Sequence, residues 1–270
     1  MSNPLFERIE DAVKVLNLDI SADEFASLAN EIELDPSQLS AVEKVFEYLK
    51  EKKIETTKQT IFKMSRLPMT NVKTFENFDF SLIRGKDVDR LKALPSLSAI
   101  HSHKNLAFIG PAGTGKTHLA QAFGYECCMQ GLKTYFIKMT ELRDKFTLAR
   151  RTGREAAVLN GLIRPSCLIL DEVGHCVFDK ENTRLFFDLI DRRYNKEGSF
   201  NIVFTSNKVP AIWRECFCED DALLCALDRI FDDATVYNIR GESFRGKRLE
   251  SINLQTTKVK ANTSTEQSVV

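Results

Sequence analysis

The feature that most constrains the fold is a glycine-rich segment, residues 110–117, which fits the spacing G-x-x-x-x-G-K-[ST]. An apolar run, residues 106–109, precedes it, and a helical pattern begins at about Lys116. In this context the glycines let the backbone turn tightly, so that successive N–H groups point toward phosphate oxygens. The segment therefore predicts a P-loop that binds a nucleoside triphosphate. Its residues are Gly110, Pro111, Ala112, Gly113, Thr114, Gly115, Lys116 and Thr117.

Short apolar runs alternate with longer amphipathic stretches from residue 105 onward. The predicted strands are residues 106–109, 134–137, 167–170, 202–205 and 236–239, and the predicted helices are residues 116–130, 140–151, 181–196 and 220–231. Gly131 and Gly198 stand where C-terminal caps belong. The first four strands are apolar on both faces, as in a buried parallel sheet. The pattern predicts an α/β fold, a P-loop NTPase core with a central parallel sheet.

The rest of the chain divides into segments of different character. Residues 1–66 predict short helices, with capping boxes at Ser21 and Asp35, and we interpret them as a helical N-terminal interaction domain. A domain that only packs on its neighbour is the alternative. Residues 67–104 predict an extended connector with aromatic anchors and a short helix at 86–94. Residues 105–250 form the predicted ATPase domain, and the polar residues 251–270 a disordered tail.

Composition excludes several classes of protein. Lys and Arg number 38, as do Asp and Glu, so net charge gives no general argument for nucleic-acid binding. None of the seven cysteines forms a C-x-x-C pair, which argues against a zinc site and for reduced thiols in a cytoplasmic protein. We expect neither a signal peptide nor a membrane span.

A second motif follows about fifty residues after the P-loop. The apolar run 167–170 leads directly into Asp171 and Glu172, as a Walker B strand beside the P-loop strand would. We expect Thr117 and Asp171 to hold Mg²⁺ and Lys116 to approach the β- and γ-phosphates of ATP. We expect Glu172 to activate water as general base, which makes hydrolysis as well as binding the predicted activity.

Three further residues are candidates for the same reaction. Asn207 follows the next strand and would orient the water between Glu172 and the γ-phosphate; an ordinary turn residue is the alternative. Arg229 ends an amphipathic helix and would reach the γ-phosphate of a neighbouring subunit as an arginine finger. A helix-end arginine meeting the dipole is the alternative. Arg245 would contact nucleotide in its own subunit or be a solvated surface residue.

A basic face is predicted between residues 138 and 164, where seven basic residues stand against three acidic ones. Such a face can contact nucleic-acid phosphates without sequence specificity, although a solvated helix would have the same composition. The candidate DNA contacts are Arg143, Lys145, Arg150, Arg151 and Arg154.

Taken together, these motifs resemble the IstB/DnaC-type AAA+ ATPases. The resemblance covers about residues 65–250, and the distinguishing pieces are Gly-Lys-Thr-His-Leu at 115–119, Thr-Ser-Asn at 205–207, Asp-Arg at 228–229 and Gly-Glu-Ser-Phe-Arg at 241–245. It implies a AAA+ core, and it carries over Lys116, Thr117, Asp171, Glu172, Asn207, Arg229 and Arg245. We also assign His118, directly after the loop, to the nucleotide site.

The same resemblance implies a function. IstB proteins are helper ATPases of a transposase, and they assemble on target DNA as ATP-bound oligomers. The DnaC branch instead loads a replicative helicase, which is the first alternative. An ATP-dependent protein-binding adaptor without a DNA role is the second. A small-molecule kinase is disfavoured, because no lid for an acceptor substrate is visible. The tail after about residue 248 and the overall neutrality both depart from the family pattern.

Overall fold

A five-stranded parallel sheet in the order β2-β3-β4-β1-β5 forms the centre of the protein. The computed structural model describes residues 4–218, 228–241 and 243. The strands are β1 (Asn105–Ile109), β2 (Thr134–Lys138), β3 (Cys167–Val173), β4 (Asn201–Ser206) and β5 (Ala234–Asn238). All five predicted strands and the predicted fold class are confirmed. β3 continues to Val173, past the predicted end at residue 170.

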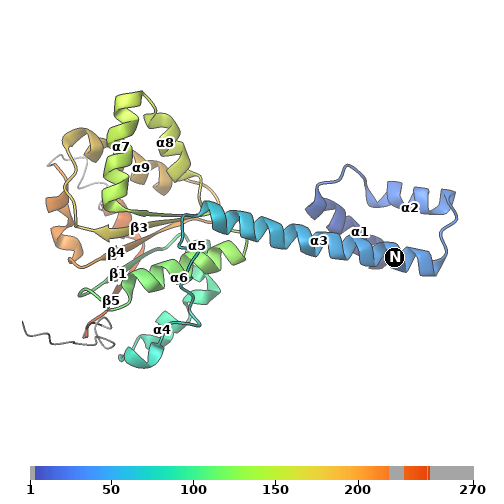
Figure 1. Cartoon of the computed structure of the whole chain (residues 1–270), viewed down its shortest axis with the longest axis horizontal. Helices are drawn as coiled ribbons and strands as arrows, with labels where there is room; N and C mark the ends of the chain where they lie inside the picture. The colour runs from blue at the N-terminus through green and yellow to red at the C-terminus, as the bar shows by residue number, and fades with distance from the viewer. Residues whose placement is uncertain (1–3, 219–227, 242, 244–270) are drawn as a thin grey trace, which may run out of the picture.

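Helices cover both faces of the sheet (Figure 1). They are α6 (Lys116–Met129) on one face and α7 (Met139–Thr152), α8 (Glu155–Ile163) and α9 (Lys180–Tyr194) on the other. The sequence did not predict α8. Gly153, with a φ of +62°, ends α7, and α8 begins without a side-chain cap, so no start signal marks it.

The connector packs along the α6 face of the sheet rather than standing away from it. It holds η1 (Phe80–Leu82), α4 (Val88–Lys92), η2 (Leu94–Ser96) and α5 (Ser98–His101). Leu67 and Phe78 are buried in the same apolar cluster as the core of α6. The helix predicted at 86–94 is present as the shorter α4, and the aromatic anchors are in place.

The N-terminal segment has an apolar cluster of its own. Its helices are α1 (Pro4–Leu16), α2 (Ala22–Glu31) and α3 (Pro36–Met64), and Ile9, Val13 and Phe25 form the cluster. Both predicted capping boxes are present. The prediction of only short helices was wrong, since α3 has 29 residues and runs from the N-terminal helices to the sheet (Figure 1). After Pro36, no glycine or proline interrupts it.

The end of α3 is attached to the sheet edge. The carbonyl of Ser65 accepts a hydrogen bond of 2.7 Å from the N–H of Phe136 in β2. The guanidinium of Arg66 lies 2.8 Å from the carboxylate of Glu141 in α7. These contacts fix the C-terminal end of α3 against both β2 and α7.

Two smaller predictions have different outcomes. Gly131 does follow the C-cap residue of α6, with a φ of +79°. Gly198 does not cap α9, because that helix already ends at Tyr194. Most of the helix predicted at 220–231 and the tail at 251–270 lie outside the described residues, although the chain is helical at 228–232. Among the described helices, none has the length and apolar character that crossing a bilayer requires.

One buried charge organises the edge of the sheet where the strands begin. Arg193 of α9 is 1% exposed, and its two terminal nitrogens donate five hydrogen bonds to backbone carbonyls. The acceptors are Leu162, Ile163, Pro165, Ser166 and Asn201. Burial lowers the pKa of Arg193 to about 10, so the group remains charged at neutral pH.

Replacing this arginine should therefore be costly. We expect Arg193→Met to lower the free energy of unfolding by roughly 3 kcal/mol or more, because buried carbonyls lose their donors. The matched control is Arg192→Met, which removes an exposed ion pair with Asp188 and should cost under about 1 kcal/mol. Urea denaturation measures both, and equal losses would contradict this account of Arg193.

Candidate nucleotide site

The P-loop lies between β1 and α6, with other backbone segments close against it. A side chain at Gly110 would place its Cβ 2.0 Å from the carbonyl oxygen of Ile239. At Gly113, where φ is +79°, a Cβ would lie 2.0 Å from the hydroxyl oxygen of Ser243. Glycine is therefore required at both positions by close approach, and at Gly113 by backbone conformation as well.

The start of α6 provides donors for an anion. Gly115 precedes the helix in the left-handed conformation and offers no side-chain cap. The first N–H groups of a helix have no intrahelical acceptor, so here they remain available to an anionic ligand. The ammonium of Lys116 donates a 2.6 Å hydrogen bond to the carbonyl of Pro111, and the Thr114 hydroxyl donates to the same oxygen at 2.9 Å. Lys116 thus folds back over the loop.

Asp171 joins three elements of the site. One of its carboxylate oxygens, Oδ1, accepts hydrogen bonds from Thr117 at 2.8 Å and from Thr205 at 2.6 Å. The carboxylate is 1% exposed. Burial raises the pKa of Asp171, and the two hydroxyl donors partly oppose that shift. The P-loop and the acidic end of β3 therefore lie together, as the sequence predicted.

Glu172 occupies an irregular position at the end of β3. The register of β3 against β4 shifts between Leu170 and Val173, and Glu172 has a φ of +62°. Its N–H donates to the hydroxyl of Thr205 at 3.0 Å. Its carboxylate lies 3.4 Å from the ammonium of Lys138, the last residue of β2. A bulge of this kind redirects a side chain. Here it brings the carboxylate of Glu172 to the C-terminal end of the neighbouring strand β2.

A histidine links Glu172 to Asn207. His175 Nδ1 lies 3.2 Å from the carbonyl oxygen of Glu172, and His175 Nε2 lies 3.5 Å from the amide nitrogen of Asn207. One tautomer satisfies both contacts, with the proton on Nδ1 and Nε2 as acceptor. The sequence analysis missed the contacts of Lys138 and His175. No sequence signal identifies Lys138, because its contact depends on the register that pairs it with Asp171 across β2 and β3.

The side chain of His118 does not lie over the P-loop. Its Nε2 is 2.9 Å from the carbonyl oxygen of Thr74, and its ring meets that of Phe78 edge to face at 5.0 Å. Burial lowers the pKa of His118, which favours the neutral ring. The ring therefore holds the connector, and the assignment of this side chain to nucleotide binding stays a prediction. The backbone N–H of His118, in the first turn of α6, is compatible with that assignment.

The two candidate arginines have different outcomes. Arg229 lines a cavity with Asn105 and Asp233, at the edge of the sheet opposite the P-loop. It cannot meet its own Glu172 there. Arg245 lies outside the described residues, although the nearby Ser243 lies against Gly113, so the chain after β5 passes the P-loop.

The candidate DNA contacts also separate into two groups. Arg143 pairs with Asp144, and Arg150 makes a two-pronged contact to Asp179 at 3.1 and 2.9 Å. Lys145 lies 3.4 Å from the hydroxyl of Tyr135. The side chains of Arg151 and Arg154 are exposed and make no hydrogen bond or ion pair within the described part of the chain. Only these last two are entirely available to a partner.

The sheet order, the P-loop after β1 and the acidic pair near the end of β3 define a AAA+ type P-loop protein. The DnaC helicase loader has the same fold, with a TM-score of 0.51 and 18% identity over 62% of this chain and 96% of that one. AMPPCP-bound DnaA from Aquifex aeolicus also has a TM-score of 0.51, with 23% identity over 63% of this chain and 51% of DnaA. At these identities the similarity establishes the fold alone.

The sequence identifies the family. Residues 12–251 match the IstB-like ATP binding protein family, and the chain belongs to it. An ATP-binding protein of insertion sequence IS5376 from Geobacillus stearothermophilus is 33% identical over 249 residues, covering 90% of this chain and 96% of the relative. One of insertion sequence IS21 from Pseudomonas aeruginosa is 36% identical over 194 residues, covering 72% and 71%. The resemblance read from the motifs is confirmed.

The close approach at Gly113 gives a testable expectation. Gly113 and Gly131 share a φ of +79°, but a Cβ at Gly131 would meet nothing within 4 Å. Gly131→Ala should cost about 1–2 kcal/mol of stability from backbone strain alone. Gly113→Ala should cost more and weaken Mg-ATP binding at least about tenfold, or about 1.4 kcal/mol. Urea denaturation and titration with a fluorescent ATP analogue measure the two effects. Identical behaviour of the variants would contradict the fit described for the loop.

Proposed function

We propose that this protein binds and hydrolyses ATP and, assembled as an oligomer on DNA, assists a transposase in insertion-sequence transposition. The observation that carries the proposal is the 2.8 Å hydrogen bond between Thr117 and Asp171, which joins the P-loop to the acidic strand end. The family membership and the names of its relatives, ATP-binding proteins of insertion sequences, support the biological setting.

The residues present fit a magnesium ion. The Thr117 hydroxyl and the Asp171 carboxylate are hard oxygen donors that share one hydrogen bond, and Mg²⁺ prefers such ligands. When bound, the ion would neutralise charge on the terminal phosphates of ATP. The N–H groups at the start of α6 would bind the phosphates, and Lys116 would exchange its bond with the Pro111 carbonyl for one with a phosphate oxygen.

Hydrolysis requires a base near the γ-phosphate, and Glu172 is the residue we assign. Its half-exposed carboxylate lies beside the ammonium of Lys138, and His175 ties its backbone toward Asn207. In this arrangement Glu172 would take a proton from the attacking water, and Asn207 would orient that water.

A glutamine at position 172 tests the base. Glu172→Gln keeps the shape but cannot accept the proton, so turnover should fall at least about 100-fold while Mg-ATP binding remains. Glu141→Gln is the matched control, since Glu141 is also a half-exposed carboxylate in an ion pair, with Arg66. A phosphate-release assay and a binding titration give the two quantities. Unchanged turnover in Glu172→Gln would remove the residue from the reaction.

The domain organisation remains part of the proposal. Residues 1–66 would dock a partner protein, which their separate apolar cluster and the long helix α3 support. A transposase is the partner that the insertion-sequence relatives favour. Capture of a replicative helicase instead would support the DnaC-like alternative.

DNA contact would use Arg151, near the end of α7, and Arg154, which precedes α8. The double variant Arg151→Ala with Arg154→Ala should weaken DNA binding and lower the salt dependence, d log K/d log[salt], by about 2, at roughly 0.9 for each lost phosphate contact. The control, Arg184→Ala with Arg192→Ala, removes the same charge from α9, where both arginines pair with acids. Fluorescence anisotropy at several salt concentrations measures the slopes. Equal slopes for the two variants would contradict this location, and no DNA affinity at all would favour the adaptor alternative.

A further inference from the structure

Arg229 and the P-loop of the same subunit lie at opposite edges of the sheet. Asn105, the first residue of β1, donates a hydrogen bond to the carbonyl of Ile230, next to Arg229, whereas the P-loop follows the last residue of β1. A strand of five residues spans about 16 Å. A role for Arg229 in ATP hydrolysis therefore requires a second copy of the chain.

One face of α9 contacts the Arg229 side chain. Phe187, Asp191 and Tyr194 follow one another at helical spacing of i, i+4 and i+7, so they share that face. The guanidinium carbon of Arg229 lies 5.6 Å from the ring centre of Phe187 and 5.8 Å from that of Tyr194. Its Nη1 lies 2.7 Å from Asp191 Oδ1. We call Phe187, Asp191 and Tyr194 the arginine socket.

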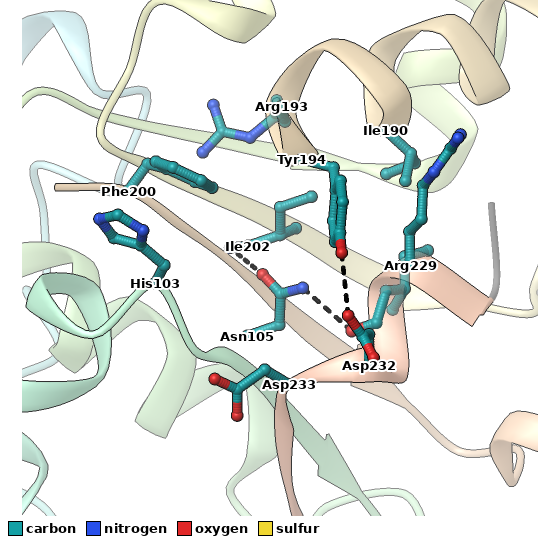
Figure 2. Close-up of a pocket in the computed structure, with 11 residues that line it drawn as sticks. His103, Asn105, Ile190, Arg193, Tyr194, Phe200, Ile202, Arg229, Asp232 and Asp233 are labelled. Carbon is teal, nitrogen blue, oxygen red and sulfur yellow. Dashed lines mark hydrogen bonds between the residues drawn. The ribbon is translucent and has the colours of Figure 1, made fainter. Parts of the chain in front are cut away.

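The socket is itself supported. The hydroxyl of Tyr194 donates a 2.9 Å hydrogen bond to Asp232, as Figure 2 shows. A phenol is protonated at neutral pH and can donate this bond, which raises the pKa of Tyr194 further. Asp232 lies on the same segment as Arg229, and the contact therefore fixes the spacing between α9 and the arginine.

Arg229 is held in place through one of its nitrogens. The buried Nη1 forms the short ion pair with Asp191, and neither Nε nor Nη2 donates a hydrogen bond to an acceptor within the described residues. Arg193 of α9, which lines the same cavity, instead donates five hydrogen bonds to backbone carbonyls. A buried arginine that serves only the fold is expected to look like Arg193. Arg229 has the contacts of a group that is oriented but keeps donors for another ligand.

A cavity of about 210 Å³ opens beside this arginine (Figure 2). Arg229 and Tyr194 line it together with Asp232 and Asp233. The side chain of Arg229 is one-third exposed, so a partner can reach the guanidinium without unfolding the helix.

We propose that the arginine socket preorganises Arg229 for the triphosphate bound to a neighbouring copy, which makes Asp191 a positioning residue for hydrolysis in that neighbour. This inference rests on the proposed ATPase function. The rings restrict the rotamers of the long side chain, and the single contact with Asp191 sets its direction. Less ordering is then needed when the neighbouring phosphate arrives.

The test uses the full chain and compares Asp191→Asn with Asp188→Asn. Both aspartates lie on α9, are about one-third exposed and pair with an arginine, Asp188 with Arg192. Asp191→Asn should lower kcat for ATP hydrolysis about 10- to 100-fold, while the Kd for Mg-ATP and the melting temperature match those of Asp188→Asn. Arg229→Ala should lower kcat at least as much.

Mixing the Asp191→Asn and Glu172→Gln variants distinguishes a loss of Arg229 positioning from a structural defect within one subunit. Asp191→Asn keeps Glu172, and Glu172→Gln keeps a well-positioned Arg229. Mixed oligomers should therefore turn over ATP faster than either variant alone.

Each other outcome overturns a defined claim. If Asp191→Asn behaves like Asp188→Asn while Arg229→Ala is inactive, the socket is rejected and the proposed function stands. If mixing restores nothing, Asp191 does not act across the subunit boundary. If Arg229→Ala retains full kcat, the role of Arg229 is rejected, and with it the socket. Absence of turnover in the unaltered chain would reject the proposed function itself.

Discussion

The structure of the site depends on one buried carboxylate oxygen, Oδ1 of Asp171. It accepts hydrogen bonds from Thr117 at the start of α6 and from Thr205 at the end of β4. β4 lies between β1 and β3 in the sheet, so Thr205 fills the space between the loop strand and the acidic strand. Burial raises the pKa of Asp171, which means that the charged form is disfavoured until a cation compensates it. The fold thus prepares a buried carboxylate whose charge two hydroxyl donors only partly stabilise.

Much of this site could be predicted from short sequence segments, because the residues that bind phosphate and metal stand close together in the chain. A backbone that wraps phosphates needs glycines at fixed spacing, and Gly113 shows why, since its φ is +79° and an added Cβ would meet Ser243. A strand apolar on both faces that ends in acids predicts a buried parallel strand, and β3 is one. Parallel strands place their carboxyl ends at one edge of the sheet, so the meeting of Thr117 with Asp171 was predictable without knowing the strand order.

The side-chain contacts that the sequence could not predict depend on the register between strands and on segments far away in the chain. The partner of Glu172 is Lys138 only because β2 pairs with β3 so that Lys138 stands opposite Asp171. The ring of His118 turns to the connector because Thr74 and Phe78 pack there, 44 and 40 residues earlier in the sequence. Composition likewise overstated the basic face, since Asp179 follows β3 and yet neutralises Arg150 of α7.

Different functional residues lie at the two ends of β1, and this affects how copies of the chain could assemble. One edge of the sheet holds the P-loop, Asp171 and Glu172, and the opposite edge holds Arg229 in the arginine socket. A rigid parallel sheet separates them, so no rotamer change within one subunit can join them. Under the proposed role of Arg229, stacking copies head to tail would bring the two edges together and add this arginine to the neighbouring nucleotide site. Under that arrangement, contacts that change the stacking would change turnover without altering the P-loop, and a DNA scaffold would act by aligning subunits rather than by touching nucleotide.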